Sequence, residues 1–416
     1  MPIIRDTLPP MRVVFLTSRL PFPPEGGDRF RVFHQIRTAS EAGHEVHLVT
    51  FACGRPDPMS IAPLERLLAS ITVVPLPPLL SAFRAAKAIA GCAPFQAAYY
   101  RSRRMEEQVR LMLRRVQPDV VVTHLFRMAP YALANGHTCD ARWILDLTDV
   151  ISAGIARSLP FRKGLDRWLY REERRRIQRY ESEISPRFDE CWVISHAERN
   201  ELMRIAPSAD VRVVPNGLVP NSCLDGNAPD PARLLFLGFH QVFHNRDAVR
   251  FLVQDILPRV RESVPEATLD VVGAGGEALG PWARGPGVHV LGHVPRLEPY
   301  FARATVFVAP HRFAAGVQNK VVHALANGVP VVATSIVRQG LEPIPKGLIL
   351  TGESAHEIAA RVVDVIRNPA RAAFMAERGR EWARATFNWR ATLEALEAGD
   401  IDSATHAAEP LVSTAV

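Results

Sequence analysis

Residues 304–335 read ATVFVAPHRFAAGVQNKVVHALANGVPVVATS and decide the fold. An apolar run at 304–310 precedes a short segment whose apolar residues have helical spacing, and a second apolar run follows at 330–335. Apolar runs of this length on both sides of a helix indicate two buried strands joined by a crossover, which makes the strands parallel. The stretch therefore predicts an α/β domain built on a parallel sheet.

The same alternation continues along the chain. One series of strand-like runs lies at 12–18, 44–51, 71–77, 119–125, 142–148 and 190–196, and a second lies at 211–219, 233–239, 267–272, 288–294, 304–310, 330–335 and 347–351. We interpret the two series as two Rossmann-like domains, 11–205 and 212–380, whose parallel sheets face each other across a cleft. Residues 381–397 are predicted to form a helix that crosses back to the first domain, and 399–416 a disordered tail.

The composition is that of a globular protein. The 416 residues are 47% hydrophobic and 22% charged, and no apolar run reaches the roughly 18 residues of a membrane span. The first ten residues lack an apolar core of signal-peptide length, so we expect either a short disordered leader or a true start at Met11. The cysteines are scattered without a CxxC pair, which favours reduced thiols and a cytoplasmic location. They are Cys53, Cys92, Cys139, Cys191 and Cys223.

Positive charge is concentrated in one segment. The net charge is +7, and residues 157–187 contain ten Arg or Lys and five Asp or Glu, which is +5 for this segment. One interpretation is a solvated helix with ion pairs at i,i+4 spacing, and another is attraction to an anionic membrane surface. Nucleic acid is not an expected partner, because no aromatic interleaving or nucleic-acid motif accompanies the charge.

Glycines follow two of the predicted strands, at the edge where ligands of parallel sheets bind. Gly26 and Gly27 precede a predicted helix, and glycines beside a helix N-terminus favour anion binding. The pattern is not G-x-G-x-x-G, so NAD is not expected. Gly273 and Gly275 end a strand of the second domain in the same way. For both loops the alternative is a turn shaped only by backbone geometry.

Ionisable side chains also follow strands of the first domain. His124 ends one strand and would point near the cleft, although a lone histidine is commonly structural. Asp146 and Asp149 end the next strand, where a carboxylate could orient a sugar hydroxyl or cap a helix.

The segment after 304–310 combines three features of an anion site. Gly316 precedes the helix, Lys320 lies on its first turn, and Arg312 stands just beyond the strand. Backbone N–H groups at a helix N-terminus together with two cations suit a diphosphate. The alternative is an exposed polar face whose cations contact only water.

These segments, taken together from 11 to 397, resemble the GT-B glycosyltransferases of glycosyltransferase family 4. TSRLPFPPEGGDRFRVFHQI with its later GHEV resembles that family's opening, VVPNGL its linker, and FLGFHQVFHNRDAVRFL the start of its donor domain. RFAAGVQNKVVHALANGVPVVATS resembles its donor-site helix, most closely in sugar transferases of bacterial exopolysaccharide and protein-sorting systems. The resemblance implies the GT-B fold and a hexosyltransferase that uses a nucleotide-diphosphate sugar.

The resemblance also implies roles for single residues. Arg312 and Lys320 would neutralise the diphosphate leaving group, and His124 would approach the transferred sugar. The remaining positions would contact the donor: Gly26 and Gly27 at the diphosphate, Gly273, Gly275 and Val294 in loops beside the base, and Gly316, Val317 and His323 in the donor-site segment. The family's pattern further implies no metal or cofactor and retention at the anomeric carbon. We expect a lipid-linked or polysaccharide acceptor, and the basic segment 157–187 favours one reached from the inner face of a membrane.

The chain departs from the family's pattern at four positions. Ala315 and His323 stand where many members have two glutamates, the second of which contacts the ribose. Phe239 and Asn245 stand near where members often have Arg and Lys. A histidine can bond a ribose hydroxyl but is a different acceptor from a carboxylate. A second hypothesis is therefore a non-catalytic member that binds nucleotide or glycan as a scaffold. An epimerase is disfavoured, since no carboxylate-rich site for proton abstraction accompanies the GG loop.

Overall fold

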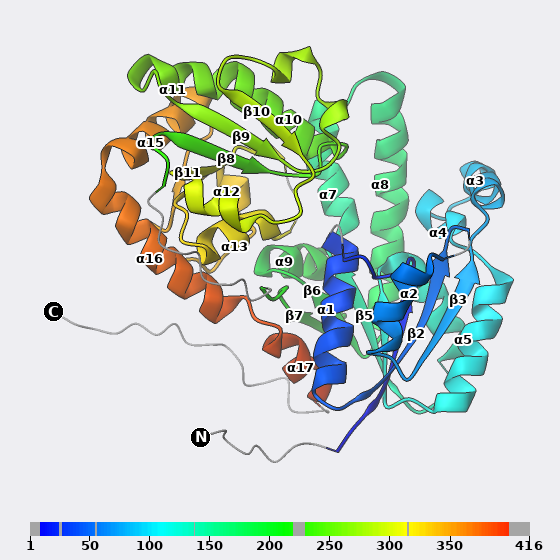
Figure 1. Ribbon diagram of the computed structural model, residues 1–416. Coiled ribbons are helices and arrows are strands. Elements are labelled where there is room, and N and C mark those ends of the chain that lie inside the picture. Colours follow the sequence, from blue (N-terminus) through cyan, green and yellow to red (C-terminus); the bar gives the residue numbers. More distant parts are fainter. Residues whose placement is uncertain are drawn as a thin grey trace, which may run out of the picture.

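The computed structural model describes residues 9–24, 27–54, 56–136, 138–218, 229–313 and 316–398. Two α/β domains lie one above the other, each built around a parallel sheet (Figure 1). The GT-B architecture that the resemblance implied is confirmed. Gly26, Ala315, Cys223 and the predicted tail 399–416 lie outside the described residues.

The first sheet has seven strands in the order β3-β2-β1-β4-β5-β6-β7, and each neighbouring pair is parallel. The strands are β1 (Arg12–Thr17), β2 (Glu45–Ala52), β3 (Ser70–Pro75), β4 (Val120–His124), β5 (Arg142–Thr148), β6 (Glu190–Val193) and β7 (Val211–Val213). The last of these corrects our assignment of 211–219 to the second domain. Val211 packs into the first domain's core, so the run that looked like a new beginning completes the first sheet.

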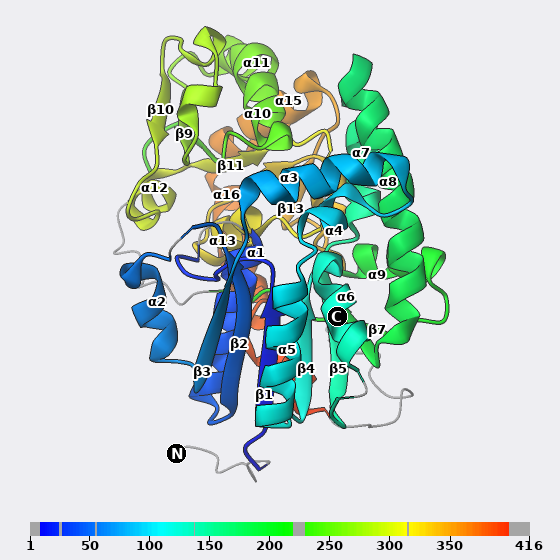
Figure 2. The same cartoon turned by 90° about the vertical axis from the view of Figure 1, so that its right-hand side faces the viewer.

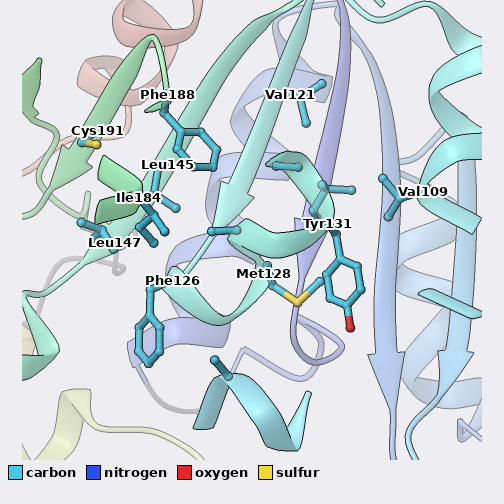
Figure 3. Close-up of a cluster of buried hydrophobic side chains, with 14 of the residues drawn as sticks. Val109, Val121, Phe126, Met128, Tyr131, Leu145, Leu147, Ile184, Phe188 and Cys191 are labelled. Carbon is cyan, nitrogen blue, oxygen red and sulfur yellow. The ribbon is translucent and has the colours of Figure 1, made fainter. Parts of the chain in front are cut away.

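Helices cover both faces of this sheet. They are α1 (Gly27–Glu41), α2 (Pro58–Glu65), α3 (Pro78–Lys87), α4 (Phe95–Tyr99), α5 (Arg103–Val116), α6 (Ala129–Asn135), α7 (Ile151–Ser158), α8 (Gly164–Ile184) and α9 (His196–Ile205). Successive residues of β1 enter opposite cores: Val14 joins the cluster under α5, α6 and α8, and Val13 the cluster under α1. Figure 3 shows the first of these clusters, with Val109 of α5, Tyr131 of α6 and Leu145 of β5 among its members. Burial on both faces explains why the strands are continuous apolar runs.

The second sheet has six parallel strands in the order β10-β9-β8-β11-β12-β13. The strands are β8 (Arg233–Leu237), β9 (Thr268–Val272), β10 (Val288–Gly292), β11 (Val306–Ala309), β12 (Val331–Ala333) and β13 (Ile349–Thr351). The helices are α10 (Phe243–Phe251), α11 (Leu257–Ser263), α12 (Glu298–Arg303), α13 (Asn319–Ala326), α14 (Ser335–Gln339), α15 (Ala355–Arg367), α16 (Pro369–Thr386) and α17 (Arg390–Glu397). The strand–helix–strand unit predicted from 304–335 is β11–α13–β12.

The C-terminal helices connect the two domains. α16 packs on α13 and α17 packs on α1, so the chain does return to the first domain (Figure 1). The crossing is not the single helix that the sequence suggested, because the chain leaves the helix between Thr386 and Arg390. Trp389 in this break stacks on His34 of α1, with 5.0 Å between the ring centroids.

The basic segment 157–187 forms most of a helical hairpin. α7 and α8 stand beside the second domain in Figure 1, joined by a 3-10 turn at Leu159–Phe161. Ion pairs at i,i+4 spacing run along α8, including Arg176 with Glu172 and Arg179 with Glu183. No helix within the described ranges is both long and apolar enough to cross a membrane.

Candidate active site at the junction of the two domains

The carboxyl edges of the two sheets meet at a junction of close contacts. The backbone N–H of Gly316, in the loop after β11, donates to Glu198 of α9 over 3.1 Å. The ring of His323 on α13 lies 6.3 Å from that of Phe30 on α1. The segment that the sequence singled out is thus held against the first domain.

Lys320 lies on the first turn of α13 with its ammonium among neutral partners. It donates to the side-chain oxygen of Asn245 on α10, and the Nε2 atom of His311 lies 3.1 Å from its Nζ. The Phe236 ring centroid is 5.5 Å from Nζ, a cation–π distance. No acidic side chain forms an ion pair with Lys320 in the part of the chain that the structure describes. The ammonium is therefore held in place without being neutralised.

Three histidines surround this lysine and are held neutral. Burial, and next the charge of Lys320, lower the pKa of His240 to about 4 and that of His244 to about 4. The same two causes lower the pKa of His311 well below its usual range. Burial also lowers the pKa of Lys320 to about 7. Near neutral pH, Lys320 is thus the group in this cluster that can take up a proton when an anion binds beside it.

Arg312 is not a second free cation beside Lys320. Its guanidinium forms a two-point ion pair with Asp247 of α10, with 2.9 Å between Nε and Oδ2. It also stacks over the rings of Phe161 and Phe251, with its Cζ 5.2 and 5.3 Å from their centroids. Arg312 is therefore paired with the carboxylate of Asp247, whereas Lys320 contacts the neutral amide of Asn245.

His124 ends β4 and faces a buried ion pair. Its Nδ1 lies 3.6 Å from Asp146 Oδ2, and Arg31 of α1 donates through Nε to the same oxygen over 2.7 Å. Burial alone would raise the pKa of Asp146, but Arg31 and His124 hold it well below its usual range. Both ring nitrogens of His124 are buried, and neither has a hydrogen-bond partner within the described residues.

The predicted glycine turn of the first domain opens onto a second charged cluster. α1 begins at Gly27, where an added Cβ would meet no atom within 4 Å. Asp28 next to it pairs with Arg19 at 3.3 Å and lies 3.7 Å from Arg127. Arg127 is buried and donates through Nε to Ser18 over 3.0 Å. Sequence reasoning missed Arg127, although its place just after His124 in an apolar run was a usable signal.

Two carboxylates meet Gly316 at the junction. Glu198 is buried and also accepts from Val150 N over 2.6 Å and from Arg157 over 2.7 Å. Burial, and next the charge of Glu198, raise the pKa of Asp149 well above its usual range. Gly316 has φ +53°, and a Cβ there would lie 1.8 Å from Asp149 Oδ1. A cavity of about 350 Å³ adjoins this contact. Our interpretation of Gly316 as a donor residue missed this packing role.

The two glycines predicted to lie beside a base stand where two loops approach each other closely. A Cβ on Gly273 would lie 1.9 Å from the carbonyl oxygen of Gly238, and one on Gly275 would crowd His240 and Gln241. Both glycines therefore allow the β8 and β9 loops to approach each other.

The apolar members of the predicted donor set belong partly to the core. Val317 is buried, and Val294 packs against the same cluster. The side chain of Val317 would therefore not reach a ligand without repacking, whereas that of Val294 is partly exposed.

Two family models match the chain, one for each domain. The model described as "Glycosyl transferase 4-like domain" matches residues 26–217, and the one described as "Glycosyl transferases group 1" matches residues 231–368. The chain belongs to the GT-B glycosyltransferases of the family 4 type. The two matches fall on the two sheets in the expected order.

One curated relative of this GT-B chain is the GDP-mannose-dependent alpha-(1-6)-phosphatidylinositol monomannoside mannosyltransferase of Mycolicibacterium smegmatis. It is 34% identical over an alignment of 153 residues that covers 32% of this chain. The match spans about two fifths of that relative's length, 39%.

Solved structures with the same fold cover nearly the whole chain. Sucrose-phosphate synthase from Thermosynechococcus elongatus has a TM-score of 0.68 at 18% identity, over 92% of this chain and 97% of that one. Anabaena Alr3699/HepE in complex with UDP-glucose has a TM-score of 0.65 at 13% identity, over 93% and 99%. At such identities the comparison bears on the fold.

Three of the positions that depart from the family's pattern lie within the described residues. Asn245, near where the resemblance led us to expect a lysine, accepts a hydrogen bond from the ammonium of Lys320. Phe239 is exposed and uncharged, so this position supplies no cation. His323 faces Phe30, and burial lowers its pKa, so it is a neutral imidazole at the position of the family's second glutamate.

Proposed function

We propose that this protein transfers a hexose from a nucleotide-diphosphate sugar to a lipid-linked or polysaccharide acceptor, with retention of the anomeric configuration and without a metal cofactor. The family models support transfer of a glycosyl group. The arrangement around Lys320 supports a diphosphate as the leaving group. Acceptor, retention and metal independence are the parts of the proposal that need experiment.

The ammonium of Lys320 is the observation that carries the proposal. It lies on the first turn of α13, held by Asn245 and His311 without a carboxylate in contact among the described residues. An unneutralised cation in a low-dielectric site attracts an anion strongly, and a helix N-terminus adds to that attraction. A diphosphate is the anion that the family's donors carry.

Lys320 would act on the bond that breaks. When the bond between the sugar's anomeric carbon and the β-phosphate oxygen cleaves, the electron pair stays on that oxygen and the charge on the diphosphate increases. A fixed cation stabilises this change more than the ground state, which is the condition for a faster reaction. The acceptor hydroxyl bonds to the anomeric carbon, and its proton passes to the departing phosphate oxygen.

His124 would orient the transferred sugar. One ring nitrogen faces Asp146, which is kept ionised by Arg31, and the other has no hydrogen-bond partner within the described residues. A carboxylate on one side of an imidazole fixes the ring's orientation and its tautomer. The opposite nitrogen is then available to accept from, or donate to, a sugar hydroxyl.

The names of the compared proteins define the donors to screen first. The mycobacterial relative is named for GDP-mannose, and a solved neighbour contains UDP-glucose. We therefore propose a screen of GDP and UDP hexoses by mass-detected hydrolysis and transfer, with and without extracted membrane lipid.

Lys320→Met is the test variant of this screen, and Lys346→Met is its matched control. Lys346 is an exposed lysine of the same domain. We expect Lys320→Met to lose about 10²-fold or more of the turnover, the usual effect of removing one group that stabilises developing charge. Full turnover in Lys320→Met would contradict the site assignment. Proton NMR of the first product gives the anomeric configuration, and activity in EDTA tests metal independence.

A binding module without turnover is the second candidate function. The neutral His323 and the exposed Phe239 favour it, since both replace polar donor contacts of the family. Calorimetry that detects nucleotide binding, combined with no hydrolysis or transfer across the whole donor screen, would support this candidate against the enzyme.

A further inference from the structure

The segment around α3 exposes an unusual number of large apolar side chains. Leu79 is 87% exposed, Phe83 66%, Ile89 59% and Leu80 45%. Leu79, Leu80 and Phe83 lie within one turn of helix, so they share a face. Other exposed apolar residues, such as Leu111 and Phe374, stand on separate helices, as is normal for a protein surface.

The first turns of α8 expose a second apolar group. Leu165 is 78% exposed, Trp168 59% and Leu169 39%. Figure 2 shows α3 lying across the view from the end of β3 toward α8. Further along α8, Arg176 joins this helix to the turn that follows α3 by donating to the carbonyl oxygen of Ile89 over 3.1 Å.

Both helices combine this apolar surface with positive charge. From Arg66 to Met105 the sequence contains Arg and Lys but no Asp or Glu. Lys87 on α3 is exposed, and so are the α8 cations Lys163, Arg167, Arg171 and Arg175. Exposed leucine and aromatic residues edged by Lys and Arg are the combination that an anionic membrane interface attracts.

We propose that these two helices form a docking face for an anionic phospholipid bilayer. The docking face consists of Leu79, Leu80, Phe83 and Ile89 of the α3 segment and Leu165, Trp168 and Leu169 of α8. An anionic bilayer is favoured over a second copy of the chain, because two copies would bring the same cations against each other.

The docking face lies close to the candidate active site. α3 follows β3 at the carboxyl edge of the first sheet. The turn that leads into α8 reaches the donor-side loop, where the rings of Phe161 and Phe313 stack with 4.4 Å between centroids. An enzyme docked by this face would have its active site near the bilayer surface. The docking face would bring the enzyme to a lipid-linked acceptor. This part of the inference rests on the proposed function.

Vesicle cosedimentation tests the face without donor or turnover. The full chain is mixed with vesicles of phosphatidylcholine alone, or of phosphatidylcholine with 30% phosphatidylglycerol, a fraction of the order used for anionic surfaces. Leu79→Gln with Phe83→Gln is the test pair, and Leu111→Gln with Phe374→Gln is the control pair of similarly exposed apolar residues.

We expect binding to the anionic vesicles alone. The test pair should weaken it roughly tenfold or more, and the control pair should leave it unchanged. Lys87→Gln and Arg171→Gln should each weaken it by about fivefold, an effect that added salt reduces. Trp168→Gln should weaken binding as well, which links α8 to the same face.

Three results would overturn the docking face. The first is equal binding to neutral and anionic vesicles, and the second is unchanged vesicle binding by the test pair. The third is a dimer in sedimentation that the test pair dissociates, which would make the face an interface between two copies of the chain. Donor hydrolysis without vesicles is measured on the same variants. Normal hydrolysis with lost vesicle binding separates failure of the face from failure of the proposed function.

Discussion

The ammonium of Lys320 on α13 donates a hydrogen bond to the side-chain oxygen of Asn245 on α10. The resemblance places a basic residue of the family near the position of Asn245. Here the amide holds the charge of a lysine that comes from a different helix.

Binding of a nucleoside diphosphate should weaken as pH rises above about 7. Burial lowers the pKa of Lys320 to about 7. Above that pH the free protein loses the positive charge of Lys320, and below that pH the charge is present and can bind the diphosphate. His240 and His244, with pKa values of about 4, stay neutral throughout. Calorimetry from pH 6 to 9 in buffers of different ionisation enthalpy should show proton uptake on binding near pH 8. A flat profile would count against Lys320 as the ligand.

Gly316→Ala should reduce activity far more than Gly347→Ala. Both glycines have positive φ, +53° and +86°, so both variants carry the backbone strain of an L residue. Only the Cβ at Gly316 would meet Asp149, at 1.8 Å, and push the two domains apart. Steady-state transfer rates of the two variants separate strain from the clash. Equal losses would show that the junction contact is unimportant.

Arg31→Met should destabilise the protein by about 3–5 kcal/mol, because it leaves the buried carboxylate of Asp146 without its partner. The cation holds the pKa of Asp146 below its usual range, so the stabilisation is present above pH 4 and is lost as pH falls further. Urea unfolding at pH 7 measures the effect. Arg390→Met, which breaks the exposed pair with Glu394, is the control and should cost under about 1 kcal/mol.

Asp149→Asn should stabilise the protein more at pH 7.5 than at pH 4.5. Burial and Glu198 raise the pKa of Asp149, so between its usual value near 4 and neutral pH the folded state binds more protons than the unfolded state. The wild type therefore loses stability as pH rises through this window, and asparagine removes the loss. Paired urea titrations at the two pH values measure the difference. A pH-independent difference would mean that the carboxyl pair is not coupled.

Local pattern was enough to predict both sheets, because a strand buried on both faces is a continuous apolar run. It was not enough for β7, whose apolar run is the same whichever sheet accepts it. The break before α17 also escaped prediction, since it depends on Trp389 reaching His34, more than 350 residues away in the sequence.

The candidate site was predictable where function follows position in one element, and unpredictable where it depends on distant partners. Lys320 stands on the helix that the sequence indicated. The pairing of Arg312 with Asp247 joins residues 65 positions apart, and that of Lys320 with Asn245 joins residues 75 apart. The periodic pattern of residues within one helix or strand does not reveal contacts between residues so far apart in the sequence. The apolar exposure of α3 is likewise a property of what the fold leaves uncovered.

The central claim, that Lys320 binds the diphosphate of the donor, is tested most directly by a thermodynamic cycle in calorimetry. The affinities of a nucleoside diphosphate and its monophosphate are measured for the wild type, Lys320→Met and Lys346→Met, for both UDP and GDP series. We predict that the β-phosphate strengthens binding about tenfold or more in the wild type and the control, as a charge-assisted contact does, and that Lys320→Met abolishes this gain. An undiminished gain in Lys320→Met would contradict the account.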